Sequence, residues 1–158
     1  MEKIIIRKNP NGDTRTAPKD ISFEQFAEAN DSHRSDVRRV MQLLGYLTVL
    51  AGENHDYTKK GEYEKKFYKD FCATMNDGFN FIEGDWWNEH VNTERHHLLA
   101  HCPEDVNLID VLEMVTDCTC AGLARSGEVR PMEITEETLK KAMDNTVELI
   151  KDMVEVVD

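Results

Sequence analysis

The sequence predicts an all-α protein, a helical bundle with a small N-terminal β-hairpin or extended arm. Apolar residues recur every three or four positions along most of the chain, turn-forming residues separate these stretches, and a β-branched run stands near the N-terminus. With 158 residues and 40% hydrophobic content, the chain suits one compact domain. We therefore expect residues 1–20 to form the arm or hairpin and residues 21–158 to form a single helical domain.

Local signals define the N-terminal elements. An isoleucine run at residues 4–6, followed by turn-forming residues at 9–13, predicts an extended segment or a hairpin. Ser22 and Gln25 fit a capping box that opens a short helix. The polar residues 30–32 are expected to interrupt this helix.

The remaining helices follow from apolar periodicity and start signals. They are expected at residues 33–52, 62–71, 107–124 and 135–154, with a further helix beginning at Trp86. The stretch from Trp86 to His101 forms either one continuous helix or two, the second capped by Asn92 or Thr93. The choice decides which of His96 and His97 faces a site, because neighbours on a helix point about 100° apart.

Charge and composition exclude several classes of partner. The formal net charge is −12, so the chain lacks the basic field that binding to nucleic acid or an anionic membrane requires. No apolar run reaches the roughly 20 residues of a membrane-spanning helix, and the N-terminus lacks a signal-peptide hydrophobic region. The four cysteines form no C-x-x-C pair. We expect a soluble, cytoplasmic protein with reduced thiols.

An ordered set of histidines and aspartates indicates a metal site. His55 and Asp56 are adjacent, and a neighbouring imidazole and carboxylate can bind one divalent cation if the fold supplies further ligands. His33 lies upstream and Asp117 downstream. Asp117 interrupts an apolar helix, where a carboxylate that faces the core needs a cation or donors; Asp110, seven residues earlier, is the alternative late ligand. The small residues around Asp117 favour it, although it can also be a surface carboxylate.

The order of these residues resembles the HD-domain superfamily of metal-dependent phosphohydrolases, whose pattern is a His, a His-Asp pair and a late Asp on the helices of a bundle. Lys59 completes the His-Asp-x-x-Lys form found in several branches of that superfamily. The resemblance covers residues 32–125. The segment at 87–90, with Arg95-His96-His97 after it, is also similar to a small group of phage and bacterial proteins of unknown function within or near the superfamily.

The resemblance implies a phosphohydrolase that acts on a small phosphate ester, with a nucleotide as the substrate by family analogy. The metal ligands would be His33, His55, Asp56 and Asp117, while Lys59, His90, His96 and His97 would neutralise phosphate charge. This ligand chemistry accepts Mn, Fe, Co, Ni, Zn or Mg. Two-metal branches add two histidines, usually from well-separated segments, so a second ion is left open here.

Two other functions share the same pattern. A di-iron oxygenase of the same fold requires His90 and a partner histidine to complete a second iron site. A non-catalytic metal- or nucleotide-binding module would keep the ion without turnover. The apolar residues of the last expected helix pack on the domain or pair with a second copy, so a homodimer is also left open.

Overall fold

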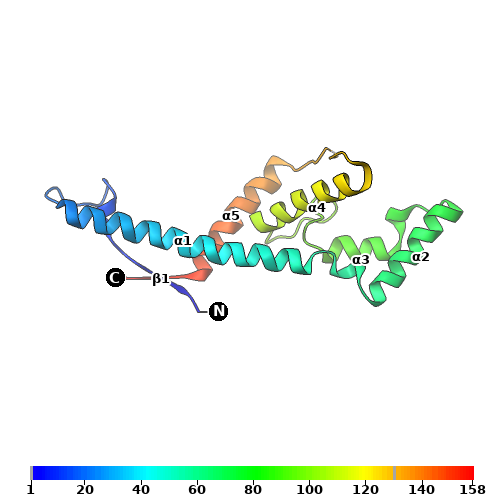
Figure 1. The fold of residues 1–158 in the computed structure, drawn as a ribbon, viewed down its shortest axis with the longest axis horizontal. Helices are drawn as coiled ribbons and strands as arrows, with labels where there is room; N and C mark the ends of the chain where they lie inside the picture. Colours follow the sequence, from blue (N-terminus) through cyan, green and yellow to red (C-terminus); the bar gives the residue numbers. More distant parts are fainter. Residues whose placement is uncertain (1, 130) are drawn as a thin grey trace. The chain divides into compact units, whose positions relative to one another are not determined.

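The structure is a computed structural model that describes residues 2–129 and 131–158. It is predominantly α-helical, which confirms the predicted all-α class (Figure 1). Contacts divide the chain into two compact units: the described residues up to Leu47 together with Val147–Asp158, and Thr48–Thr146. The helices are α1 (Phe23–Asn54), α2 (Glu62–Asp77), α3 (Asp85–Thr93), α4 (Leu108–Ser126) and α5 (Glu136–Met153), and the strands are β1 (Ile4–Arg7) and β2 (Val154–Val157).

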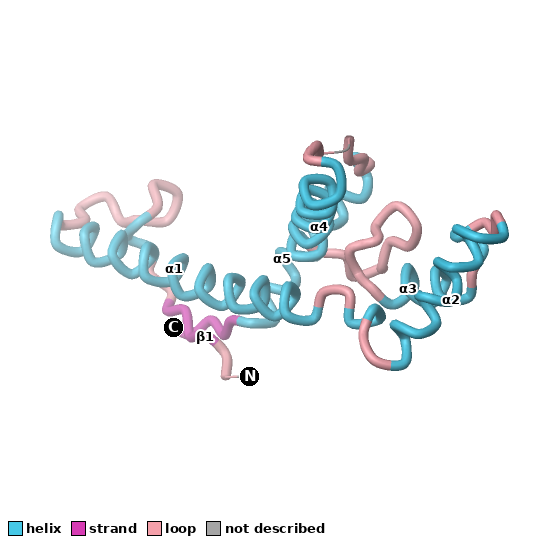
Figure 2. Tube along the Cα trace, turned by 45° about the vertical axis from the view of Figure 1, so that its right-hand side comes forward, coloured by secondary structure: helices cyan, strands magenta, loops and turns pink. Residues whose placement is uncertain are grey.

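In the first unit, β1 pairs in parallel with β2, a strand from the opposite end of the chain (Figure 2). Ile4 is level with Val154 along this pair, and the Lys8 backbone N–H extends it by donating to the Val157 carbonyl at 2.9 Å. The turn-forming residues after β1 make a short 3₁₀ helix, Pro10–Gly12. The N-terminal segment is therefore an extended strand rather than one arm of a local hairpin.

Helix α1 begins as the sequence predicts but has no break. Ser22 and Gln25 form the capping box, with the Ser22 N–H donating to Gln25 at 3.0 Å and the Gln25 N–H donating to Ser22 at 3.2 Å. The expected interruption at residues 30–32 is wrong. Asp31 is exposed and pairs with Arg34 one turn later, so this polar stretch is solvated on the helix surface instead of ending the helix.

In the second unit, aromatic side chains pack between α2 and α3 and contact the loop that follows α1. Phe67, Phe81 and Trp86 contact one another with ring centroids 4.2 to 6.0 Å apart. Trp86 is 2% exposed, and its indole N–H donates to the Thr58 carbonyl at 3.0 Å. Because buried aromatic rings bury large apolar areas, this cluster fixes the position of the loop that carries His55 and Asp56.

A second core in the same unit joins α4 to the first part of α5. Its buried members are Leu98, Val106, Met114 and Ala142. Thr146 on α5 accepts a hydrogen bond from the Leu108 N–H at 2.9 Å, at the start of α4. Among the described helices, none has both the length and the apolar character that a transmembrane span requires.

Candidate metal centre

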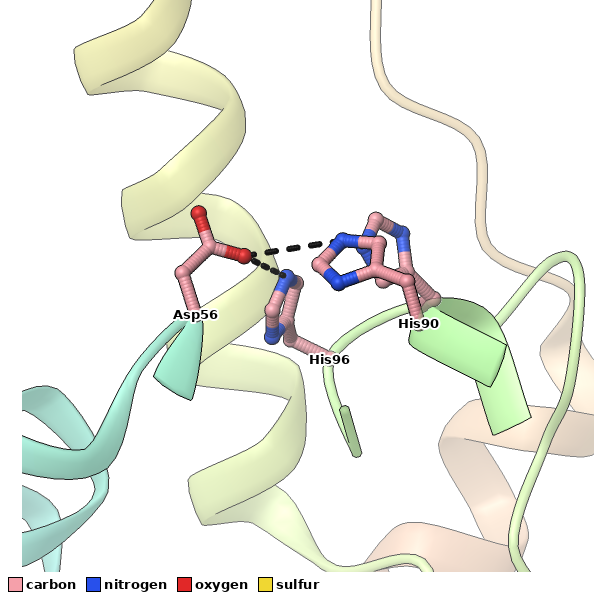
Figure 3. Close-up of side chains that lie close together, drawn as sticks. Asp56, His90 and His96 are labelled. Atoms are coloured by element: carbon pink, nitrogen blue, oxygen red, sulfur yellow. Dashed lines mark hydrogen bonds and ion pairs between the residues drawn. The ribbon is translucent and has the colours of Figure 1, made fainter. Parts of the chain in front are cut away.

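Six side chains that can bind a metal ion converge in the second unit. They come from the loop after α1, from α3, from the turns that follow α3, and from α4. Figure 3 shows three of them, Asp56, His90 and His96. The ligand atoms of all six form two overlapping groups, each with all atoms within 4.8 Å of one another: Asp56, His90, His96 and His97 in one, and His55, His96 and Asp117 in the other. A buried His/Asp cluster that could hold a metal ion is therefore present.

Four of these residues form a closed ring of alternating imidazoles and carboxylates. His55 Nε2 lies 3.3 Å from Asp56 Oδ2 and 3.4 Å from Asp117 Oδ1. His96 Nε2 lies 3.8 Å from Asp56 Oδ1 and 3.9 Å from Asp117 Oδ2. Two tetrahedral ligands that each lie about 2.1 Å from one ion are about 3.4 Å apart. The His55 distances match this spacing, whereas the His96 distances are longer and involve the other oxygen of each aspartate.

Two atoms that face each other in this ring lack hydrogen-bond partners. Asp56 Oδ1 and His96 Nε2 are both buried, and neither has a hydrogen-bond partner among the described residues (Figure 3). A buried polar atom without a partner costs about 1–3 kcal/mol. A divalent cation between them would satisfy both lone pairs at once, so the residues present fit a metal ion.

Glu113 orients two of the histidines. One of its carboxylate oxygens accepts from His55 Nδ1 at 3.0 Å and from His96 Nδ1 at 3.1 Å. Because an ionised carboxylate only accepts, both imidazoles carry a proton on Nδ1, and in their neutral forms they turn the lone pair of Nε2 towards the ring. Sequence reasoning missed Glu113. Its signal is the spacing of four residues to Asp117, which places both side chains on one face of α4.

Thr58 and Glu94 orient His90. The backbone N–H and the hydroxyl of Thr58 both donate to Glu94 Oε1, at 2.8 and 2.6 Å. The hydroxyl proton is thereby used, so Thr58 Oγ1 accepts from His90 Nδ1 at 2.6 Å. His90 therefore turns its unprotonated Nε2 towards Asp56 Oδ1, 3.5 Å away (Figure 3). Sequence reasoning missed this relay as well, because nothing in the sequence distinguishes Glu94 from other acidic residues.

His97 closes the cluster beside His90. Its Nε2 lies 2.7 Å from His90 Nε2, and because the latter atom is unprotonated, His97 donates this hydrogen bond. The sequence left open which of His96 and His97 faces the site. Both do, because α3 ends at Thr93 and the turns that follow it present the two side chains to the same cluster.

Burial and charge set the protonation of the cluster. Burial lowers the pKa of His90 to about 3 and the pKa of His97 to about 4, and neighbouring histidines and Lys59 act in the same direction. Burial also lowers the pKa of His96, but the hydrogen bond and charge of Glu113 outweigh it and raise that pKa overall. Neutral imidazole is the form that binds metals, and it is the form that burial favours at His90 and His97.

Lys59 brings a positive charge to the edge of the ring. Its ammonium group donates to Asp56 Oδ2 at 2.5 Å. Burial raises the pKa of Asp56, but the hydrogen bond and charge of Lys59 outweigh that effect and hold the pKa below its ordinary value. Asp56 is therefore an ionised carboxylate with one oxygen on Lys59 and the other directed at His90 and His96.

Residues 22–156 match the model of a family of unknown function, DUF5662. The chain belongs to this family. No curated protein and no solved structure matches it. The matched range includes every residue of the cluster, but the family description carries no activity. The chemistry of this DUF5662 protein therefore has to be inferred from the cluster.

The structure does not bring His33 into the cluster of the DUF5662 protein. No group of candidate ligands among the described residues includes it. His33 is exposed on α1 in the first unit, where it lines a shallow hollow with Phe26 and Arg34. His33 lies in the first unit, whereas every residue of the cluster lies in the second. The histidine that the structure groups with His55 and Asp117 is His96.

Asp110 has a structural role. It is 3% exposed, and its two oxygens accept from Arg95 Nε at 2.7 Å and Arg95 Nη2 at 2.8 Å. It also accepts from the Asn107 N–H at 2.8 Å, which completes a capping box at the start of α4. Of the two aspartates that the sequence offered as the late ligand, the structure brings Asp117 to the cluster.

Two hollows open beside the cluster. The first, of about 330 Å³, is lined by residues of α1 and α4 and reaches His55, Glu113 and Asp117. The second, of about 280 Å³, is lined in part by Trp87 and reaches His96, His97 and Asp117. A substrate group in either hollow would lie next to the ligand atoms.

Proposed function

We propose that this protein is a metal-dependent phosphohydrolase that cleaves a small phosphate ester. In the reaction, water and a phosphate monoester give an alcohol and inorganic phosphate. A water oxygen bonds to phosphorus, the bond from phosphorus to the ester oxygen breaks, and one water proton ends on the alcohol. The observation that carries the proposal is the ring of two imidazoles and two carboxylates around the unpartnered Asp56 Oδ1 and His96 Nε2.

The proposed ligands are His55, His96 and Asp117, whose ligand atoms lie within 4.8 Å of one another, and Asp56, whose two oxygens lie 3.3 Å from His55 Nε2 and 3.8 Å from His96 Nε2. A divalent cation bound to them would lower the pKa of a bound water and polarise a phosphoryl oxygen. His96, which the sequence suggested as a phosphate-neutralising group, is a ligand in this proposal. The ligand types accept Mn, Fe, Co, Ni, Zn or Mg.

Lys59 and His97 are the proposed contacts to the phosphoryl group. The Lys59 ammonium group already lies at the edge of the ring, and the His97 N–H, which donates to His90 in this structure, would turn from His90 to a phosphoryl oxygen. Donors of this kind stabilise the charge on phosphoryl oxygens during transfer. The His55-Asp56 pair, Lys59 and Asp117 also fit the HD-domain pattern, so we infer a divergent relative of that superfamily whose first histidine comes from a different segment. A nucleotide substrate follows from this analogy alone.

A di-iron oxygenase is the second candidate. One observation favours it: the two oxygens of Asp56 face different histidines, Oδ2 towards His55 and Oδ1 towards His90 and His96. A carboxylate in this position can bridge two ions, which would use both overlapping ligand groups. Iron content and consumption of oxygen with loss of substrate would favour this candidate over hydrolysis.

Metal analysis coupled to phosphate release tests the proposal. The purified protein is loaded separately with each of the six metals and incubated with nucleotides and simple phosphomonoesters, with and without oxygen. We expect oxygen-independent phosphate release that is lost, together with the metal, in His55→Ala and Asp56→Ala. His101→Ala is the matched control, because His101 is an exposed histidine of the same unit.

Two outcomes would contradict the proposal. Wild-type metal content in His55→Ala and Asp56→Ala would show that the ring is not the metal site. A protein that binds metal in the ring but releases no phosphate from any ester would be an oxygenase if it consumes oxygen, and a binding module if it does not.

A further inference from the structure

The first hollow has a wall that the proposed metal chemistry does not use. Its uncharged lining residues are Thr48, Ala51 and Gly52 on α1 and Ile109, Leu112, Thr116 and Cys120 on α4. At its inner end it shares His55, Glu113 and Asp117 with the metal centre. A volume of about 330 Å³ suits a small organic group.

We propose that this hollow binds the uncharged, apolar alcohol part of a phosphate monoester whose phosphate lies at the metal centre. The proposal rests on the proposed function for the identity of the phosphate group. It deepens that function by naming the class of ester, an alkyl or aryl monophosphate rather than a nucleoside triphosphate.

Charge excludes a second phosphate from the hollow. None of its lining residues is a lysine or an arginine, whereas Glu113 and Asp117 stand at its inner end. A diphosphate or triphosphate that extended into the hollow would meet these carboxylates in a chain whose formal net charge is already −12. Lys59 can bind the single phosphate at the ring, where its ammonium group forms an ion pair with Asp56.

The hollow is also poorly equipped to recognise a nucleobase. The Thr116 hydroxyl donates to the Leu112 carbonyl at 2.8 Å, so its proton is not available to a ligand. Ala51, Ile109 and Leu112 offer only apolar side-chain surface. A base in this position would face these apolar side chains over much of its edge, whereas an alkyl or aryl group gains from burial against the same wall.

Gly52 gives a direct way to fill the hollow. A Cβ at this position would meet no atom within 4 Å outside its own helix, and its φ is not in the left-handed region. A leucine at this position therefore extends into the hollow without backbone strain. Gly45 is two helical turns earlier on α1, is equally open, and lines none of the described hollows at the metal centre. Gly45→Leu is thus a matched control.

The experiment compares hexyl phosphate with methyl phosphate in the metal-loaded protein. We expect the wild type to favour hexyl phosphate by roughly tenfold or more in kcat/KM, because each buried methylene adds to binding. Gly52→Leu should lower this preference by about tenfold and keep its metal content, whereas Gly45→Leu should keep the preference. In the metal-free protein, 1-hexanol should shift the NMR signals of Leu112 and Ile109, and Gly52→Leu should abolish the shift.

The outcomes separate this inference from the proposed function. The inference would be overturned, and the phosphohydrolase retained, by equal activity on both esters or by no response to 1-hexanol. Loss of the preference in Ala100→Leu would overturn it too, because this variant fills the second hollow instead of the first. If no ester releases phosphate with any metal, but 1-hexanol binds in a manner that depends on Gly52, the proposed function fails and the apolar ligand site is retained.

Discussion

The cluster has two halves that hold their histidines in different ways. In the first half, His55 and His96 donate directly to the carboxylate of Glu113. In the second, His90 donates to the neutral hydroxyl of Thr58, and only that hydroxyl reaches the carboxylate of Glu94. A carboxylate bonded directly to a histidine makes it a stronger ligand than a neutral acceptor does.

This difference predicts an order of occupation. The pKa of His96 is raised overall by its carboxylate neighbours, whereas burial lowers the pKa of His90 to about 3. The half with Glu113 also includes Asp117, so it gathers more negative charge around the ring. We therefore expect the first ion to bind in the ring of His55, His96 and the two aspartates, and any second ion to bind more weakly at His90.

Glu113→Ala should give the largest effect, because one side chain orients two proposed ligands. We expect the affinity for Zn²⁺ to fall by roughly 100-fold, the upper part of the range for outer-shell partners of metal ligands. Competition with a chelating dye measures this affinity. Glu62→Ala, at an exposed glutamate of the same unit, should leave it unchanged. An unchanged affinity in Glu113→Ala would remove Glu113 as the orienting residue.

Thr58→Val should act on the other half alone, with a smaller effect. The valine side chain has nearly the shape of threonine but cannot hydrogen-bond to His90 or Glu94, so His90 loses the partner that fixes its tautomer, while the backbone N–H still donates to Glu94. We expect long-range ¹H–¹⁵N spectra to show the Nδ1-protonated form of His90 in the wild type and its loss in Thr58→Val, while His55 and His96 are unaffected. Thr58→Ser should restore the wild-type spectrum. The same tautomer in Thr58→Val would refute the relay.

Asp110→Asn should mainly affect stability. Asp110 forms a bidentate salt bridge with Arg95, the residue directly before His96. It also caps the start of α4. Its loss weakens charge-assisted bonds at a buried carboxylate, which we expect to lower the free energy of unfolding by about 1–3 kcal/mol. Urea unfolding of the metal-free protein measures this change. If Asp110→Asn instead lost its metal at unchanged stability, the structural role assigned to Asp110 would be wrong.

The fold and part of the site could be predicted from the sequence, for physical reasons that differ between elements. Helices such as α4 follow from apolar periodicity and the residues at their ends, which are local properties. The convergence of His55, Asp56 and Asp117 was an expectation drawn from residue order. Glu113, Thr58 and Glu94 were missed because their roles arise from contacts between segments, and the grouping of His96 with His55 and Asp117 arises in the same way.

His33→Ala should have the smallest effect and gives the sharpest distinction between order in the sequence and position in the fold. His33 precedes the His55-Asp56 pair just as the first histidine of the HD pattern does, yet it is exposed on α1 and lines a hollow with Phe26 and Arg34. We expect unchanged metal content and a change in the free energy of unfolding within about 0.5 kcal/mol, as for most surface substitutions. Metal analysis of His33→Ala beside His96→Ala makes the comparison. Loss of metal in the former and its retention in the latter would restore the ligand set suggested by residue order.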